Sequence, residues 1–187
     1  MGRRPQPPLV DALVSEAPAG HACPRAFRAL LDANARFAEG FVHGNLPPQP
    51  RRRLVLLTCM DARIDPRTAL GLDLGDTAVL RNAGARATED ALRSIAVAVH
   101  VLGARAVAVM HHTDCGMATV DQGELVRRVG TAGDAVDFLT IADPDAALRA
   151  DVERVRASAL VPDGVDVAGF RYDVTTGRVS LEVPPEH

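Results

Sequence analysis

Two short apolar runs each lead directly into a cluster of polar and sulfur-containing side chains. The run at residues 54–57 precedes Thr-Cys-Met-Asp-Ala-Arg, and the run at 106–110 precedes His-His-Thr-Asp-Cys-Gly. Apolar runs of this length, bounded by polar residues, are typical of buried strands. In an open parallel sheet, ligands bind beyond the carboxyl ends of the strands. We therefore expect both clusters to lie together at one edge of a sheet.

The side chains of these clusters suit a zinc ion. Cys59, His112 and Cys115 offer two thiols and one imidazole, which is three of the four ligands that zinc usually takes. Asp61 and Arg63 add a carboxylate and a guanidinium close to the first thiol. The pattern indicates a zinc hydrolase or hydratase site. Two alternatives stay open: His112 and Cys115 alone could be a buried structural pair, and the full set could hold a structural zinc, although such sites usually close with four Cys or His ligands.

Composition limits the classes of protein to which the chain can belong. A length of 187 residues fits one domain, and a hydrophobic content of 47% is ample for a packed core. The formal net charge of −3 and the lack of long basic runs argue against nucleic acid as a partner. No stretch reaches the about 18 apolar residues that a membrane span requires. Three cysteines are too few for a disulfide framework, which favours a cytoplasmic setting with reduced thiols.

Residues 1–50 are expected to form an N-terminal arm, because 8 of the 13 prolines fall there. The first 22 residues or so have no clear period and predict a mobile tip. Apolar residues at helical spacing predict an amphipathic helix over about 24–39, followed by a proline-rich connector. Such a helix can pack on a neighbouring subunit as easily as on its own domain, so oligomerisation is plausible from the sequence alone.

Residues 51–187 alternate between strand and helix patterns and predict a single α/β domain. Strands are expected at 54–58, 77–81 and 106–112, helical segments at 66–70, 88–102 and 145–160, and a closing hairpin at 167–173 and 179–183. Around residues 116–133 the chain is rich in glycine, and no element is predicted there. The pattern favours a mainly parallel open sheet of about four parallel strands plus an antiparallel C-terminal edge strand, with helices on both faces.

Three segments carry a resemblance to a known family. Cys59-Met-Asp-Ala-Arg63, Arg81-Asn-Ala-Gly84 and His112-Thr-Asp-Cys-Gly116 are similar to the signature segments of the beta-class carbonic anhydrases, above all their short prokaryotic branch. The match runs from about Asn34 to the hairpin at 169–173 and so covers most of the chain. Ala62 departs from the family pattern, because serine is common at that position.

The resemblance implies the reversible hydration of carbon dioxide to bicarbonate and a proton by a zinc-bound hydroxide. One zinc ion per subunit would be held by Cys59, His112 and Cys115, with the fourth position open to water or hydroxide. Asp61 would accept a hydrogen bond from that hydroxide, and Arg63 would keep Asp61 ionised and oriented. In some relatives the same aspartate closes the site as the fourth ligand, and the sequence does not decide between the two states.

The resemblance also implies the surroundings of the site. Asn82, Ala83 and Gly84 would line the substrate pocket, and the subunits would form a homodimer or a dimer of dimers. A hydrolase of carbonyl sulfide or carbon disulfide is the alternative enzyme on the same fold, and a non-catalytic zinc-containing binding or sensor protein is the alternative of another class. His111 is expected to point to the opposite face of its strand, and Asp114 is expected to fix the turn between the ligands.

Overall fold

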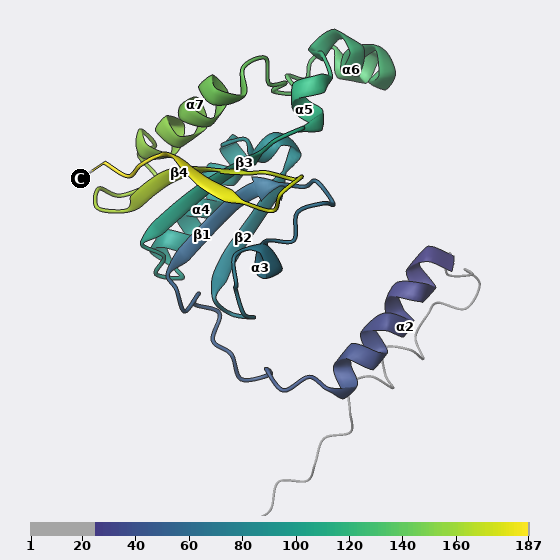
Figure 1. The fold of residues 1–187 in the computed structure, drawn as a ribbon, viewed down its shortest axis with the longest axis vertical. Coiled ribbons are helices and arrows are strands. Elements are labelled where there is room, and N and C mark those ends of the chain that lie inside the picture. Colours follow the sequence, from purple (N-terminus) through teal and green to yellow (C-terminus); the bar gives the residue numbers. More distant parts are fainter. Residues whose placement is uncertain (1–24, 187) are drawn as a thin grey trace, which may run out of the picture. The chain divides into compact units, whose positions relative to one another are not determined.

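The computed structural model describes residues 25–186, which form two compact units, one ending at Asn45 and the other beginning at Leu46 (Figure 1). Residues 1–24, where a mobile tip was expected, lie outside the described residues. The first unit contains helix α2 (Arg25–Glu39), as the apolar spacing predicted. The apolar side chains of this helix are exposed to solvent: Phe27, Leu30, Leu31 and Phe37.

The second unit is built on one five-stranded sheet in the order β2-β1-β3-β4-β5. Strand β1 pairs in parallel with β2 and with β3, β3 pairs in parallel with β4, and β5 runs antiparallel to β4. The predicted mainly parallel sheet with an antiparallel edge is confirmed. The strands are β1 (Leu54–Cys59), β2 (Thr77–Asn82), β3 (Ala106–His112), β4 (Asp166–Tyr172) and β5 (Val179–Val183). Because the direction of strand addition reverses between β1 and β3, the crevice of this fold opens at their carboxyl ends.

Helices α4 (Glu89–His100) and α7 (Pro144–Arg156) both pack on the same face of the sheet. Ile95 of α4 and Val152 of α7 are fully buried against Val55 and Val107 of the strands. Thr88 caps α4 by accepting a hydrogen bond from the Ala91 amide. The sequence predicted helices on both faces of the sheet. Within residues 46–186, both long helices instead cover the same face.

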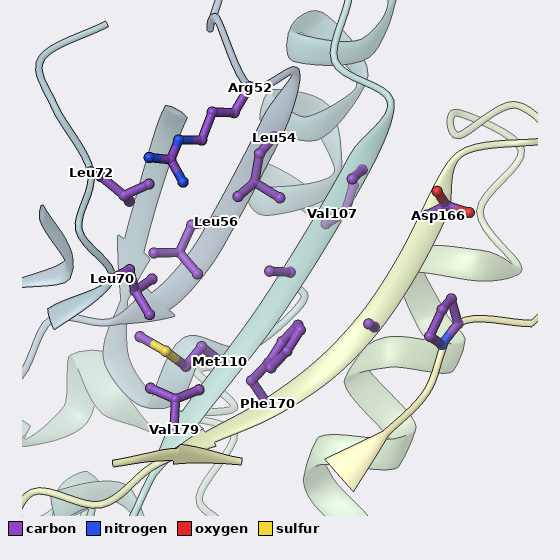
Figure 2. A pocket seen from close by; sticks show the side chains of 14 residues that line it. Arg52, Leu54, Leu56, Leu70, Leu72, Val107, Met110, Asp166, Phe170 and Val179 are labelled. Atoms are coloured by element: carbon purple, nitrogen blue, oxygen red, sulfur yellow. The ribbon is translucent and has the colours of Figure 1, made fainter. Parts of the chain in front are cut away.

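The opposite face of the sheet carries an apolar cavity of about 350 Å³ (Figure 2). Leu54 and Leu56 of β1, Met110 of β3 and Phe170 of β4 line it. The strands of a parallel sheet usually carry apolar side chains on both faces. Here the second face is apolar as well, but no long helix within residues 46–186 covers it.

The glycine-rich region contains regular structure that was not predicted. It forms α5 (Gly116–Thr119), α6 (Gln122–Val129) and the short helix η2 (Thr131–Gly133). Asp121 caps α6 by accepting a hydrogen bond from the Glu124 amide. Helix α7 ends at Arg156 and not at 160, and Leu160 lies beyond its end and is 48% exposed. The remaining elements are α3 (Pro66–Ala69) and η1 (Ala83–Ala85). Within residues 25–186, no helix is both long enough and apolar enough to cross a bilayer.

We expect Gly169→Ala to destabilise the second unit by about 1–3 kcal/mol, because overpacking forces neighbouring side chains to move. A methyl group at Gly169 would lie 2.9 Å from Val152 Cγ2 and 3.0 Å from Val183 Cβ. Urea unfolding would measure the change. Gly123→Ala is the control: this glycine lies within helix α6 with only ordinary contacts around it, so alanine should stabilise by about 0.5–1 kcal/mol. An unchanged midpoint for Gly169→Ala would contradict the packing described here.

Candidate metal centre

The ends of β1 and β3 bring the two clusters together. Cys59 is the last residue of β1, His112 is the last residue of β3, and Cys115 follows at the start of α5. The buried Thr58 hydroxyl donates to the Met110 carbonyl at 3.0 Å and ties the two strands just before their ends. As a result, the sulfurs of both cysteines and one ring nitrogen of His112 lie within 4.8 Å of one another, and all three residues are buried.

The imidazole of His112 is oriented as a metal ligand requires. Its Nδ1 lies 2.9 Å from the carbonyl oxygen of Thr113, which can only accept, so we assign the ring proton to Nδ1. Nε2 then carries a lone pair, and among the described residues it is buried without a hydrogen-bond partner. The Thr113 amide in turn donates to the Tyr172 carbonyl of β4 at 2.9 Å. A cation between the sulfurs would satisfy this nitrogen.

The two cysteine thiols shift each other's pKa in opposite directions. Cys115 donates a hydrogen bond that lowers the pKa of the Cys59 thiol to about 3, although burial opposes the shift. The same contact, together with burial, raises the pKa of Cys115. The Gly84 amide also donates to the Cys59 sulfur, at 3.4 Å. The lowered pKa of Cys59 favours its thiolate form, and two sulfurs with one imidazole form a donor set that zinc accepts.

The backbone conformation and close packing at residue 84 explain why this residue is a glycine. Its φ is +80°, and an added Cβ would lie 3.2 Å from Ile141 Cδ1 and 3.3 Å from Met117 Cγ. Other residues rarely adopt this conformation. A side chain here would disturb the turn that aims the amide at the Cys59 sulfur.

Arg63 holds the carboxylate of Asp61 beside His112, one of the three candidate ligands. Asp61 Oδ1 accepts from the Arg63 amide at 2.9 Å and from Nε at 3.0 Å, and Oδ2 accepts from a terminal guanidinium nitrogen at 2.7 Å. These hydrogen bonds hold the pKa of Asp61 well below its usual range. Oδ2 lies 3.9 Å from His112 Nε2. Burial lowers the pKa of His112, but the neighbouring Cys59 sulfur and the Asp61 charge raise it by more.

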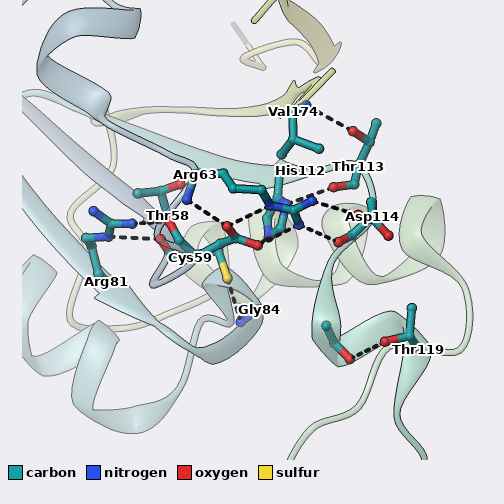
Figure 3. A network of polar contacts seen from close by, with 12 residues as sticks. Thr58, Cys59, Arg63, Arg81, Gly84, His112, Thr113, Asp114, Thr119 and Val174 are labelled. Atoms are coloured by element: carbon teal, nitrogen blue, oxygen red, sulfur yellow. Dashed lines mark hydrogen bonds and ion pairs between the residues drawn. The ribbon is translucent and has the colours of Figure 1, made fainter. Parts of the chain in front are cut away.

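The same guanidinium reaches across to the second cluster. It donates to Asp114 Oδ2 at 2.7 Å and to the Asp114 carbonyl at 2.8 Å (Figure 3). Asp114, expected only to fix a turn, has a left-handed φ of +52° and also serves as a partner of Arg63. Arg81 stabilises the first cluster, because it donates to the Cys59 carbonyl at 2.9 Å and to the Asp61 carbonyl at 2.7 Å.

A cavity of about 260 Å³ opens beside His112 and Cys115. Gly84, one of the three expected pocket residues, lines it together with Ile141. Asn82 and Ala83 are not among its lining residues. The Asn82 side chain instead closes its own loop, since it donates to the Arg86 carbonyl at 2.7 Å and accepts from the Arg86 amide at 2.8 Å.

Sequence reasoning missed a buried polar cluster on the other face of β3. His111 does point there, as expected, and its Nε2 lies 3.1 Å from Asp151 of α7. Asp151 is itself buried and accepts from Arg86. No local pattern could have found this cluster, because its members are separated by up to 65 residues.

Comparisons with known proteins agree with this geometry. The family model "Carbonic anhydrase" matches residues 54–150. Beta-carbonic anhydrase 1 of Mycobacterium tuberculosis is 36% identical over 158 residues, which cover 83% of this chain and 96% of that protein. The carbonic anhydrase of Streptococcus mutans has a crystal structure that matches with a TM-score of 0.78 and 38% identity, over 86% of this chain and 99% of that one. A carbon disulfide hydrolase of Acidithiobacillus thiooxidans is 32% identical, over 68% of this chain and 76% of that protein.

We expect Cys115→Ser to lower zinc content from about one ion per chain to nearly none after dialysis, because a serine hydroxyl is a far weaker zinc ligand than a thiolate. Elemental analysis of the purified protein would measure it. Cys23→Ser removes the third cysteine of the chain as a control and should leave the zinc content unchanged. Full zinc retention by Cys115→Ser would contradict the assignment.

Proposed function

The chain belongs to the beta-carbonic anhydrase family, and we propose that its reaction is the reversible hydration of carbon dioxide to bicarbonate and a proton. The observation that supports this proposal best is the convergence of two sulfurs and one unpartnered imidazole nitrogen beside a carboxylate that Arg63 orients. A structural zinc site would be expected to present a fourth Cys or His ligand.

In this proposal Cys59, Cys115 and the Nε2 atom of His112 hold one zinc ion per subunit. Zinc, when bound, lowers the pKa of a water molecule from about 16 to about 7, so that hydroxide is available at neutral pH. The Thr113 carbonyl fixes the His112 tautomer, and the Gly84 amide reduces the excess charge on the Cys59 sulfur. Thiol ligands must stay reduced, and for this reason we place the protein in the cytoplasm.

Asp61 is proposed to orient the attacking water and not to serve as the fourth ligand. Within residues 25–186, its Oδ2 atom accepts one hydrogen bond, from Arg63, and so keeps a lone pair free. Three hydrogen bonds from Arg63 would have to break or shift before the carboxylate could turn onto the metal. The ion pair thus favours a site whose fourth position is left to water.

The cavity beside His112 suits a small uncharged substrate. Gly84, Ala118 and Ile141 contribute apolar or backbone surface to its wall. Carbonyl sulfide and carbon disulfide are also small and linear, and a related carbon disulfide hydrolase supports hydrolysis of one of them as the second candidate function. A zinc-containing binding or sensor protein without turnover is the third.

Two assays on the zinc-loaded protein separate these candidates. Stopped-flow measurement of carbon dioxide hydration is expected to show turnover, while sulfide release from carbonyl sulfide and from carbon disulfide is expected to be slow. Sulfide release that is faster than hydration would favour the hydrolase. The absence of turnover in both assays would refute both enzyme functions.

We further propose that the subunit works as a homodimer or a dimer of dimers. Helix α2 exposes Phe27, Leu30, Leu31 and Phe37, each more than half exposed. The sheet face that carries the cavity in Figure 2 is apolar as well. Exposed apolar surfaces of this kind usually mark interfaces, and α2 of a second copy is a partner of matching chemistry for the sheet face.

We expect Asp61→Asn to retain zinc but to lower kcat by about 10–100-fold, the usual effect of removing a group that orients a metal site. An amide has a single acceptor oxygen, so it cannot keep all of the contacts with Arg63 and also accept from water. Stopped-flow hydration and elemental analysis would measure both quantities. Asp73→Asn, at an exposed carboxylate, is the control. An Asp61→Asn protein with unchanged kcat would refute the role of Asp61.

We expect Leu31→Glu to shift the protein toward the monomer in sedimentation-velocity experiments, because it places a charge within the apolar stripe of α2. Arg28→Ala, which removes a charge from the same helix and no apolar surface, should leave the assembly intact. An oligomer that survives Leu31→Glu would exclude α2 from the interface.

A further inference from the structure

Asp151 of helix α7 is a buried carboxylate on the far side of β3 from the candidate ligands. The residue is 3% exposed. Its Oδ2 atom accepts a hydrogen bond from Arg86 Nε at 2.7 Å and lies 3.1 Å from His111 Nε2. Its Oδ1 atom accepts from the Ala87 amide at 2.9 Å. One side chain of α7 therefore contacts both the loop after β2 and the end of β3.

Each partner of Asp151 adjoins a segment of the candidate zinc site. His111 is the residue before His112, and its Nε2 lies 3.1 Å from Asp151 Oδ2 without hydrogen-bond geometry. This buried contact limits the positions open to the backbone from which the His112 ring projects. Arg86 and Ala87 end the turn whose Gly84 amide donates to the Cys59 sulfur. The Asn82 side chain braces the same turn through the Arg86 backbone.

Arg86 extends these contacts to the wall of the cavity. Its NH1 donates at 2.7 Å to the carbonyl of Leu139, which has a left-handed φ of +54°. Two residues further on, Ile141 lines the cavity and would contact any side chain at Gly84. The guanidinium therefore links Asp151 to one wall of the cavity.

Asp151 is held as a carboxylate and not as a neutral acid. Burial raises its pKa, but the contacts with His111, the Ala87 amide and Arg86 lower it by more, so that the net shift is downward. The docking of α7 on the sheet does not need this charge, because Leu148, Val152 and Val155 of the same helix are fully buried in the core.

We propose that Asp151 is a positioning residue for the zinc site. Through His111 it places His112, and through Arg86 and Ala87 it places the Gly84 turn against Cys59. This inference rests on the zinc site proposed above, and it assigns to α7 a part in that site although the helix contributes no ligand.

The test compares Asp151→Asn with Val152→Ala in the full-length protein. Asparagine has one acceptor oxygen and places an N–H group against the donors of Arg86 or Ala87, so at least one contact is lost. Zinc should then leave about tenfold faster in a chelator-competition experiment. Val152→Ala removes buried methyl groups from the same helix without touching a polar contact, and zinc loss should stay within about twofold of the native rate.

A second readout needs no metal. Hydrogen exchange of the Gly84 and Ala87 amides in the metal-free protein should accelerate about tenfold or more in Asp151→Asn relative to Val152→Ala, after both are compared at equal global stability. If Asp151 only docked α7 on the sheet, the exchange rates of these amides would change equally in both variants.

Several outcomes would overturn the inference. One is zinc loss and amide exchange in Asp151→Asn that match those in Val152→Ala. If Asp151→Asn does not fold, Arg86→Gln replaces it in the test. Arg86→Gln keeps the Asp151 charge and the contacts of Asp151 with His111 and the Ala87 amide. Arg86→Gln should also speed zinc loss, and no change would refute the proposal. An Ala87 amide that exchanges freely in the native protein would refute it as well. Failure of the native protein to bind zinc would instead refute the proposed function.

Discussion

The guanidinium of Arg63 joins the ends of the two strands that carry the candidate zinc ligands. It bonds Asp61 after β1 and Asp114 after β3, and so fixes the separation between Cys59 and the segment of His112 and Cys115. Because each of its contacts joins a cation to a carboxylate or a carbonyl oxygen, the arrangement is both directional and strong. The position of Asp61 depends on it, and so does the space left for water beside the ligands.

The sheet supports this arrangement differently on its two faces. On one face α4 and α7 bury a continuous apolar core, and the carboxylate of Asp151 lies at the edge of that core below the ligand-bearing strand ends. On the other face, Leu56 and Phe170 line an open apolar cavity. The site thus lies between a face that the unit covers itself and a face that we propose a second copy covers.

The sequence was sufficient for the parts of the molecule that local patterns determine. The apolar runs fixed β1 and β3 to within one residue, and the position of Cys59, His112 and Cys115 after them placed all three together. Other features depend on contacts between distant segments. The contacts of Asp151, the exposure of Leu160 and the packing of both long helices on one face have no local signal, because tertiary packing decides them. Helix α6 did carry a capping signal at Asp121, which the surrounding glycines obscured.

We propose that the strand ends form a zinc site of two sulfurs and one imidazole. X-ray absorption at the zinc edge of the loaded protein measures this set of ligands. We expect two sulfur ligands at about 2.3 Å and two nitrogen or oxygen ligands at about 2.0–2.1 Å, one of them an imidazole. A shell with any other number of sulfurs, or one without imidazole scattering, would contradict it.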